Sequence, residues 1–473
     1  MLAAALVTAI VALTAPAADP IEAHLQQHRA DQRIPGLAYA VVSGDRVVRQ
    51  GAWGVDGDGH AVTAQTPFLI GSVSKPVTAT AVMRLVEARR LALDDPVRRH
   101  LPWFRLADGQ AAQHISVRHL LTHTSGLPRW ASRTDRFDNS AGGLARSVRD
   151  LAGVRLQSAP GTHHHYSDAN YMVLGAVVEA VTGQPFGAAL RREVLDPLGM
   201  RHSAATQAEA DSVGLPAGHR YWFGQPRRFD APYDTSGVPY GYVAASADDL
   251  ARFAMAHLKG GRLLSEETLK LMHTGEYGLG WRTSTLDGIG TRLVWHAGAT
   301  PGYFANVVLA PESGSAVVVL GNSYSPALDA PLAAAAFDVT RLLHGGTPTS
   351  SNDGDPLMRA MLPVLVAVAG LLTVTAIWSL TRAIRSSRPA EPRLRSTLAW
   401  LAACTAVAGV AALLPSMMGN DLGQALLWMP DVGWAIIAVI TLAALLAAIR
   451  VGIAVARRRA RPVGVEAAQR RPA

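Results

Sequence analysis

The sequence predicts an α+β domain over residues 19–345, followed by three membrane-spanning helices. Apolar, β-branched strand patterns form two hairpins at the ends of the domain, at 36–43 and 47–53 and at 304–310 and 316–320. Helical patterns lie between these hairpins, at 77–90, 171–182 and 248–259. Strands at both ends with helices between them predict an antiparallel sheet that the two terminal segments close together.

Three apolar runs in the last quarter of the chain predict the membrane helices, at 361–380, 397–418 and 433–456. Each run reaches the length of about 20 residues that a helix needs to cross a bilayer core. The net charge of +8 belongs to this region, because residues 357–473 hold 13 arginines and four acidic residues. The charge therefore indicates a lipid bilayer as a partner and argues against nucleic acid.

The distribution of arginine predicts how the helices are oriented. The connection between the first two runs carries five arginines, Arg382, Arg385, Arg388, Arg393 and Arg395, and four more, Arg457, Arg458, Arg459 and Arg461, follow the third run. The second connection has two aspartates and no basic residue. Arginine-rich segments stay cytoplasmic, so we expect a multi-pass protein with a cytoplasmic C-terminus and an extracytoplasmic N-terminal domain.

The segments that flank the N-terminal domain agree with export. Residues 1–18 contain a short apolar stretch that ends in Ala15-Pro16-Ala17, an A-x-A cleavage pattern typical of a signal peptide. A buried helix of the domain is the alternative for this stretch. Residues 346–356 are mostly small, polar or turn-forming and predict a linker to the first span.

The strongest chemical motif is Gly71-Ser72-Val73-Ser74-Lys75-Pro76. Lysine occurs only three times in the chain, yet one of the three stands here. Proline is tolerated in the first turn of a helix, so we expect a helix to start near Ser72. Ser72 and Lys75 would then share one helical face, with a hydroxyl beside an amine that can activate it. Ser74 would face elsewhere.

Two further motifs carry residues suited to proton transfer and to oxyanion binding. The first, Tyr166-Ser167-Asp168, precedes a helical pattern; Tyr166 can move protons, and a simple helix cap is the alternative. The second, 296–302, begins with His-Ala-Gly and enters the last hairpin. Gly298 allows close backbone approach, and the N–H of Ala299 could donate to an oxyanion; a plain strand edge is the alternative.

The three motifs, in this order on a domain of this length, resemble those of the serine β-lactamase and penicillin-binding-protein superfamily. The likeness is to its branch of class C β-lactamases, D-alanyl-D-alanine carboxypeptidases, D-amino-acid peptidases and related esterases. Further segments also look like family landmarks: 119–127 (HLLTHTSGL), 198–200, 249–253 and 277–281 (YGLGW). The resemblance covers about residues 20–345 and implies an antiparallel sheet flanked by helices, with a helical lobe.

The resemblance implies a role for each motif residue. Ser72 would be the acyl-accepting nucleophile, with Lys75 as its base partner. Tyr166 would protonate the leaving group and later activate water. The amides of Ser72 and Ala299 would form the oxyanion hole, and His296, where many relatives have Lys, would help to hold Tyr166 and the substrate.

Three departures from the family pattern bear on the substrate. Asp168 stands where Asn is usual, and an ionised carboxylate cannot donate to a substrate carbonyl. Ala297 replaces a Thr whose hydroxyl suits a substrate carboxylate. No E-x-x-L-N motif occurs, so deacylation by a separate Glu is not expected. Efficient β-lactamase activity is therefore not expected, and Asp168, His296 and Gly298 remain the predicted substrate-binding residues.

We expect from the sequence a membrane-anchored extracytoplasmic serine hydrolase that acts on amides or esters, such as D-amino-acid peptides or small esters. The alternative is a non-catalytic or slowly deacylating sensor that relays through the membrane helices. A transporter is disfavoured because the spans have no ionisable residue at their centres. We expect no cofactor and no metal, since the consecutive histidines 163–165 would point to opposite faces of a strand.

Overall fold

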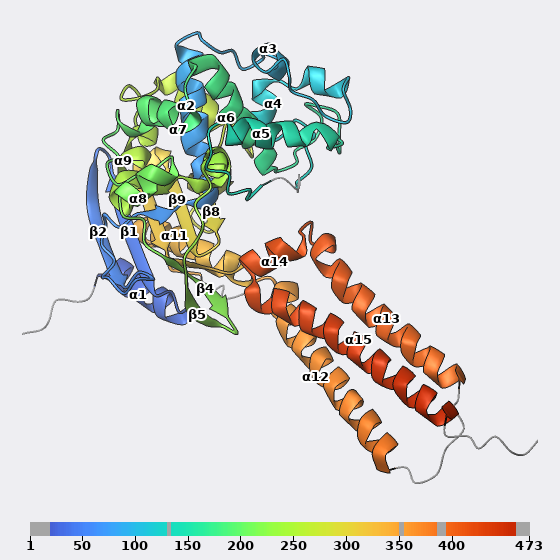
Figure 1. Ribbon diagram of the computed structural model, residues 1–473. Coiled ribbons are helices and arrows are strands. Elements are labelled where there is room, and N and C mark those ends of the chain that lie inside the picture. The colour runs from blue at the N-terminus through green and yellow to red at the C-terminus, as the bar shows by residue number, and fades with distance from the viewer. Residues whose placement is uncertain (1–18, 130–133, 350–353, 386–393, 460–473) are drawn as a thin grey trace, which may run out of the picture.

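The chain folds into an N-terminal α+β domain joined to three long helices, as the sequence predicts (Figure 1). The computed structural model describes residues 19–129, 134–349, 354–385 and 394–459. The predicted signal peptide, 1–18, lies outside the described residues.

A six-stranded antiparallel sheet in the order β2-β1-β10-β9-β8-β7 forms the centre of the N-terminal domain. Its strands are β1 (Gly36–Ser43), β2 (Arg46–Gly54), β7 (Arg282–Thr285), β8 (Arg292–Thr300), β9 (Tyr303–Ala310) and β10 (Ser315–Gly321). The first strand pairs with the last long one, with Ala40 opposite Val318. Closure of the sheet by the terminal segments is therefore confirmed.

Helices cover both faces of this sheet. Helices α1 (Pro20–Asp31) and α11 (Asp329–Leu343) pack on one face. Helices α2 (Ser74–Glu87) and α9 (Ala247–Leu258) pack on the other. Residues 37, 39 and 41 of β1 join the first core, and residues 38, 40 and 42 join the second. Because strand side chains alternate between faces, a strand covered on both sides is apolar throughout.

A second group of helices packs around α2 and forms the expected helical lobe (Figure 1). The helices of the lobe are α3 (Val97–His100), α4 (Val117–Leu121), α5 (Gly143–Arg149), α6 (Asp168–Thr182) and α7 (Phe186–Leu190). The remaining short elements of the domain are β3 (Phe68–Leu69), β6 (Ala244–Ala245), β11 (Ser323–Tyr324), α8 (Gln207–Ser212) and α10 (Glu266–Met272).

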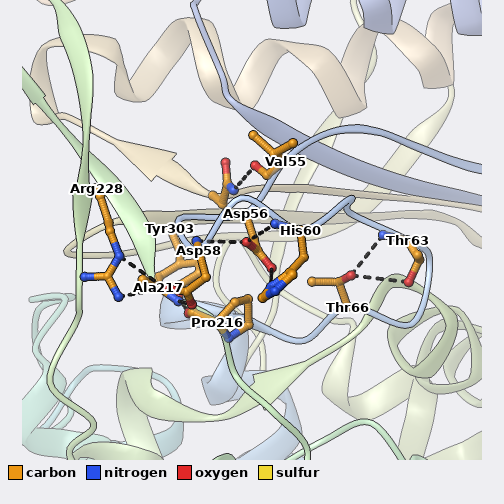
Figure 2. A network of polar contacts seen from close by, with 11 residues as sticks. Val55, Asp56, Asp58, His60, Thr63, Thr66, Pro216, Ala217, Arg228 and Tyr303 are labelled. Atoms are coloured by element: carbon orange, nitrogen blue, oxygen red, sulfur yellow. Dashed lines mark hydrogen bonds and ion pairs between the residues drawn. The ribbon is translucent and has the colours of Figure 1, made fainter.

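A two-stranded ribbon, β4 (Gly218–Trp222) and β5 (Gln225–Phe229), is tied by polar contacts to the segment that follows β2 (Figure 2). The carboxylate of Asp58 accepts a hydrogen bond from Arg228 at 2.7 Å and another from the amide of Ala217 at 3.1 Å. The ribbon also pairs with β11. These contacts fix it beside the main sheet.

The C-terminal part contains α12 (Pro356–Arg385), α13 (Leu394–Met417) and α15 (Pro430–Arg459), which are long and apolar enough to cross a membrane. Each extends beyond the start of its predicted apolar run. Helix α15 packs against both α12 and α13. A short helix, α14 (Leu422–Trp428), connects α13 to α15 at the end nearest the N-terminal domain (Figure 1).

Candidate active site

Ser72 lies in a 3-10 turn, Gly71–Val73, that leads directly into α2. The predicted helix start is therefore a tighter turn, and the α-helix itself begins two residues later. Lys75, in the first turn of α2, reaches back so that its Nζ donates a hydrogen bond to Ser72 Oγ at 2.8 Å. Ser74 points away, because its hydroxyl accepts a hydrogen bond from the Val243 amide at 3.1 Å.

The amine of Lys75 is completely buried and faces three acceptors. Besides Ser72, it donates to the carbonyl oxygen of Tyr240 at 2.9 Å and lies 2.6 Å from Oδ1 of Asp168. An ammonium has three N–H donors and no acceptor. The three partners therefore match the charged form of Lys75, and in this arrangement the amine donates to Ser72 rather than accepting its proton.

Burial and charge act on Lys75 in opposite directions. Burial alone would lower its pKa, because the charged form loses its hydration. The carboxylate of Asp168 and the neighbouring Tyr166 outweigh that effect, so the pKa of Lys75 is raised above its ordinary value. Asp168 begins α6, and a third of its side-chain surface is exposed. The sequence predicted Asp168 as a substrate contact, whereas in the structure it is paired with Lys75.

Two glycines allow β8 to lie directly against the Ser72 turn. Gly71 has a φ of 54°, and a Cβ there would lie 2.2 Å from the Ala299 nitrogen. A Cβ on Gly298 would lie 2.2 Å from the Ile70 oxygen and 2.5 Å from the Ser72 nitrogen. A side chain at either glycine would thus force the two backbones apart. The contact brings the Ser72 and Ala299 backbones together, as the predicted oxyanion hole requires.

Tyr166 lies immediately before α6, with two cations close to its ring. The Lys75 amine is 4.9 Å from the ring centre, and the guanidinium of Arg282 is 5.1 Å from it. The rings of His123 and His296 lie 4.4 and 6.3 Å away, centre to centre. Two cationic side chains and two imidazole rings therefore surround Tyr166, the residue predicted to transfer protons.

A buried chain of hydrogen bonds runs behind Tyr166. His123 Nδ1 accepts from the Ser167 amide at 3.1 Å and lies 2.9 Å from the amide nitrogen of Asn170, so its proton is on Nε2. That nitrogen is 3.1 Å from the hydroxyl of Tyr277, which is in turn 3.1 Å from Nε2 of His296. The chain sets both imidazole tautomers and makes His123 a hydrogen-bonded structural residue.

His296 is buried and neutral. Burial, with the nearby charges of Lys75 and Arg282, holds its pKa well below the ordinary value. Its Nδ1 lies 2.7 Å from the Ala297 carbonyl, to which it donates. The expectation that His296 helps to hold Tyr166 is met only by ring contact, since its two nitrogens bond elsewhere. A cationic role for His296 is not supported.

Sequence reasoning missed Arg282 and the carbonyl of Tyr240. Arg282 directly follows the YGLGW landmark, and it lies opposite Trp295, one residue before His296. Its place directly after the YGLGW landmark was the signal in the sequence that could have indicated Arg282 as a site residue. The Tyr240 carbonyl had none, because a backbone acceptor 165 residues from Lys75 leaves no pattern in the sequence.

The three consecutive histidines do not converge. The ring of His164 packs 5.5 Å from that of Tyr277, whereas the rings of His163 and His165 lie 6.3 Å from each other. Adjacent side chains point in different directions here, as expected from the alternation of an extended segment.

Comparisons with known proteins agree with this geometry. A family model described as Beta-lactamase matches residues 21–341. Penicillin-binding protein 4 of Amycolatopsis lactamdurans is 35% identical over 331 residues, which are 63% of this chain and 85% of the relative. Esterase EstB of Burkholderia gladioli is 40% identical over 221 residues, which are 44% of this chain and 55% of the relative.

A third relative also matches the C-terminal part. Protein flp of Staphylococcus aureus (strain MRSA252) is 25% identical over 438 residues, 88% of this chain and 87% of the relative. That share is larger than the N-terminal domain alone, so the match includes part of the apolar helices.

Two solved structures share the fold. The octameric penicillin-binding protein homologue from Pyrococcus abyssi has a TM-score of 0.60 at 25% identity, covering 72% of this chain and 80% of that one. EstCE1, a hydrolase with promiscuous acyltransferase activity, has a TM-score of 0.55 at 27% identity, covering 64% and 92%.

Proposed function

Because the chain belongs to the beta-lactamase family, we propose that it is a membrane-anchored serine hydrolase that forms an acyl-enzyme on Ser72. Its fold is that of serine hydrolases among the penicillin-binding proteins and esterases. The observation that carries the proposal is the buried cluster in which Lys75 Nζ contacts Ser72 Oγ at 2.8 Å and Asp168 Oδ1 at 2.6 Å.

Acylation begins with attack on the substrate carbonyl. The Oγ of Ser72 bonds to the carbonyl carbon while its proton passes to the phenolate oxygen of Tyr166. The carbonyl oxygen becomes an oxyanion, to which the amides of Ser72 and Ala299 donate. Tyr166 then protonates the leaving nitrogen or oxygen as its bond to carbon breaks. In the second half, water attacks the acyl carbonyl carbon and gives its proton to Tyr166. Tyr166 passes this proton to Ser72 Oγ as the acyl bond to Oγ breaks, which releases the acid and restores the starting state.

Lys75 serves this scheme as a fixed positive charge. Its three acceptors hold the ammonium in place, and Asp168 favours the charged form. The ammonium orients the Ser72 hydroxyl and lies 4.9 Å from the centre of the Tyr166 ring. The base is therefore Tyr166 rather than Lys75.

Two features of the site bear on the substrate class: the negative charge of Asp168 and the absence of a hydroxyl at Ala297. Asp168 is partly exposed and would repel a carboxylate close to the scissile bond. Ala297 provides no hydroxyl to bind one. Neutral esters, or amides without a neighbouring free carboxylate, are therefore favoured over β-lactams and over peptides that end in free D-Ala.

The arrangement of the long helices supports anchoring with the N-terminal domain outside the cell. Arg382 and Arg385 end α12, and Arg457, Arg458 and Arg459 end α15. Both helix ends lie far from the N-terminal domain (Figure 1). Since arginine-rich ends stay cytoplasmic, the N-terminal domain would be extracytoplasmic.

The test is intact mass spectrometry of the full chain in detergent after exposure to a fluorophosphonate probe, with a panel of small esters for turnover. Ser72→Ala and Tyr166→Phe are run beside wild type. A single adduct that is lost in Ser72→Ala, together with ester turnover, is the expected result. An adduct without turnover would favour an acylated sensor, and no adduct on a folded chain would refute the proposal.

A further inference from the structure

The short helix α14, between the second and third apolar helices, is fastened to the N-terminal domain. Arg220, on β4, donates to the carbonyl oxygens of Leu426 at 3.0 Å and Leu427 at 2.8 Å. These carbonyls belong to the last turn of α14, where helical partners are missing. The carboxylate of Asp431 also accepts a hydrogen bond from the Phe223 amide at 3.0 Å.

The ribbon that holds α14 is itself fixed. Strands β4 and β5 are tied to the segment after β2 by Asp58, Arg228 and Ala217 (Figure 2). Tyr303, at the start of β9, donates to the Pro216 carbonyl just before β4. The position of α14 is therefore set by the N-terminal domain as well as by the long helices.

Trp428, the last residue of α14, points into the N-terminal domain. Its indole N–H lies 3.3 Å from Oδ2 of Asp135 and 3.0 Å from Oε1 of Gln424, so it is shared between them. Its ring meets that of Tyr324 edge to face, 5.8 Å between centres. Trp428 packs against two apolar cores: the one between the sheet and helices α1 and α11, and the one among the long helices.

Asp135 connects Trp428 to Lys75. The Tyr242 hydroxyl donates to Asp135 Oδ1 at 2.8 Å, and the amide of Asp135 donates to the Tyr240 hydroxyl at 2.9 Å. The carbonyl of the same Tyr240 accepts from the Lys75 amine at 2.9 Å. The side chains of Trp428, Asp135 and Tyr240, with the backbone amide of Asp135 and the backbone carbonyl of Tyr240, thus link the membrane part to the amine that orients Ser72.

The Asp135 carboxyl depends on these donors. Its pKa is raised to about 6: burial is the main cause and the nearby Asp168 and Asp234 add to it, whereas hydrogen bonds from Tyr242 and Trp428 oppose the rise. A buried carboxylate that loses a donor is left with an unmet hydrogen bond. Removal of the indole N–H would therefore disturb the segment of Asp135 and the Tyr240 backbone next to it.

We infer that Trp428 is a positioning residue, which acts on Lys75 through Asp135 and Tyr240. The inference rests on the proposed function. It means that the apolar helices are part of the hydrolase unit in addition to anchoring it.

A double-mutant cycle in the full chain tests the inference. Trp428→Phe, Asp135→Asn and the double variant are assayed in detergent for ester hydrolysis. We expect Trp428→Phe to lower kcat by about threefold or more with KM little changed, and to have no such effect in the Asp135→Asn background. Equal losses in both backgrounds, or no loss in either, would overturn the inference. Trp434→Phe is the matched control, because Trp434 is exposed on α15.

A second variant weakens the attachment of α14 to the N-terminal domain and leaves Trp428 unchanged. Arg220→Gln removes the charged donor to the two α14 carbonyls, and we expect a loss of kcat similar to that of Trp428→Phe. Full activity in Arg220→Gln, with α14 exchanging its amide hydrogens faster, would overturn the inference, because the position of α14 would then have no effect on catalysis.

Hydrogen exchange provides a readout independent of turnover. The Asp135 amide, bonded to Tyr240, should exchange faster in Trp428→Phe than in wild type or Trp434→Phe. Unchanged exchange would overturn the inference. Failure of the proposed function is separate, since it appears as a missing Ser72 adduct in the wild-type chain.

Discussion

The carboxylate of Asp168 lies 2.6 Å from the amine of Lys75, in the centre of the site. The family motif usually has a neutral amide at this position. The carboxylate adds a charge partner for a completely buried lysine, and it raises the pKa of Lys75 against the opposing effect of burial. The carboxylate at this position therefore favours the charged form of Lys75.

Asp168→Asn should change the pH dependence of hydrolysis. Without the carboxylate, burial is no longer outweighed and the pKa of Lys75 falls. The ammonium is then lost at lower pH, so we expect the alkaline limb of the kcat/KM profile to move down by about 1–3 pH units. Asp94→Asn, which removes a surface partner of Arg118, should leave the limb in place. An unmoved limb in Asp168→Asn would contradict a charged Lys75 in catalysis.

We expect ester hydrolysis to depend on the positive charge of Arg282. Arg282→Met removes the guanidinium 5.1 Å from the Tyr166 ring, and we expect kcat to fall by about tenfold with KM little changed. Arg282→Lys keeps a cation and should recover part of the loss. Steady-state kinetics on one ester checks this, and equal losses in both variants would point to packing instead of charge.

Gly298→Ala should abolish activity with a modest effect on folding. The added Cβ would lie 2.2 Å from the Ile70 oxygen, which forces the oxyanion strand away from Ser72. We expect a loss of at least about 100-fold in kcat and about 1–3 kcal/mol in the free energy of unfolding. Gly153→Ala is the control, because a Cβ there meets nothing within 4 Å. Assays of ester hydrolysis measure the loss of kcat in the two variants, and thermal melts measure the loss of stability.

Substrate preference should follow the two departures from the family motifs. In the double variant Asp168→Asn/Ala297→Thr the repelling charge is gone and a hydroxyl is present. We expect faster acylation by penicillin and by peptides that end in free D-Ala, relative to neutral esters. Acylation rates by mass spectrometry measure the ratio. An unchanged ratio would show that other residues set the preference.

The orientation of the long helices can be measured with single cysteines. Cys404, the one cysteine in the chain, is first replaced by Ser. An impermeant maleimide applied to whole cells should then label Asn420→Cys, near α14, and not Ser387→Cys, among the arginines. The opposite pattern would place the N-terminal domain in the cytoplasm.

Much of the fold was predictable because its signals are local. Short apolar, β-branched runs on either side of a turn predicted the terminal hairpins, and uninterrupted apolar runs of about 20 residues predicted the three long helices. The spacing of Ser72 and Lys75 predicted their contact, since residues three apart in a helical turn are neighbours. Their 2.8 Å separation agrees with that reasoning.

The fold class, the family and the pairing of Ser72 with Lys75 follow from the amino-acid sequence alone, because spacing along a helix or strand fixes which side chains are neighbours. The ion pair of Lys75 with Asp168, the lowered pKa of His296 and the approach of Arg282 to Tyr166 depend on the tertiary structure. It also brought Trp428 to Asp135, 293 residues apart in the chain. These properties depend on burial and on charges from distant segments, which packing alone brings together.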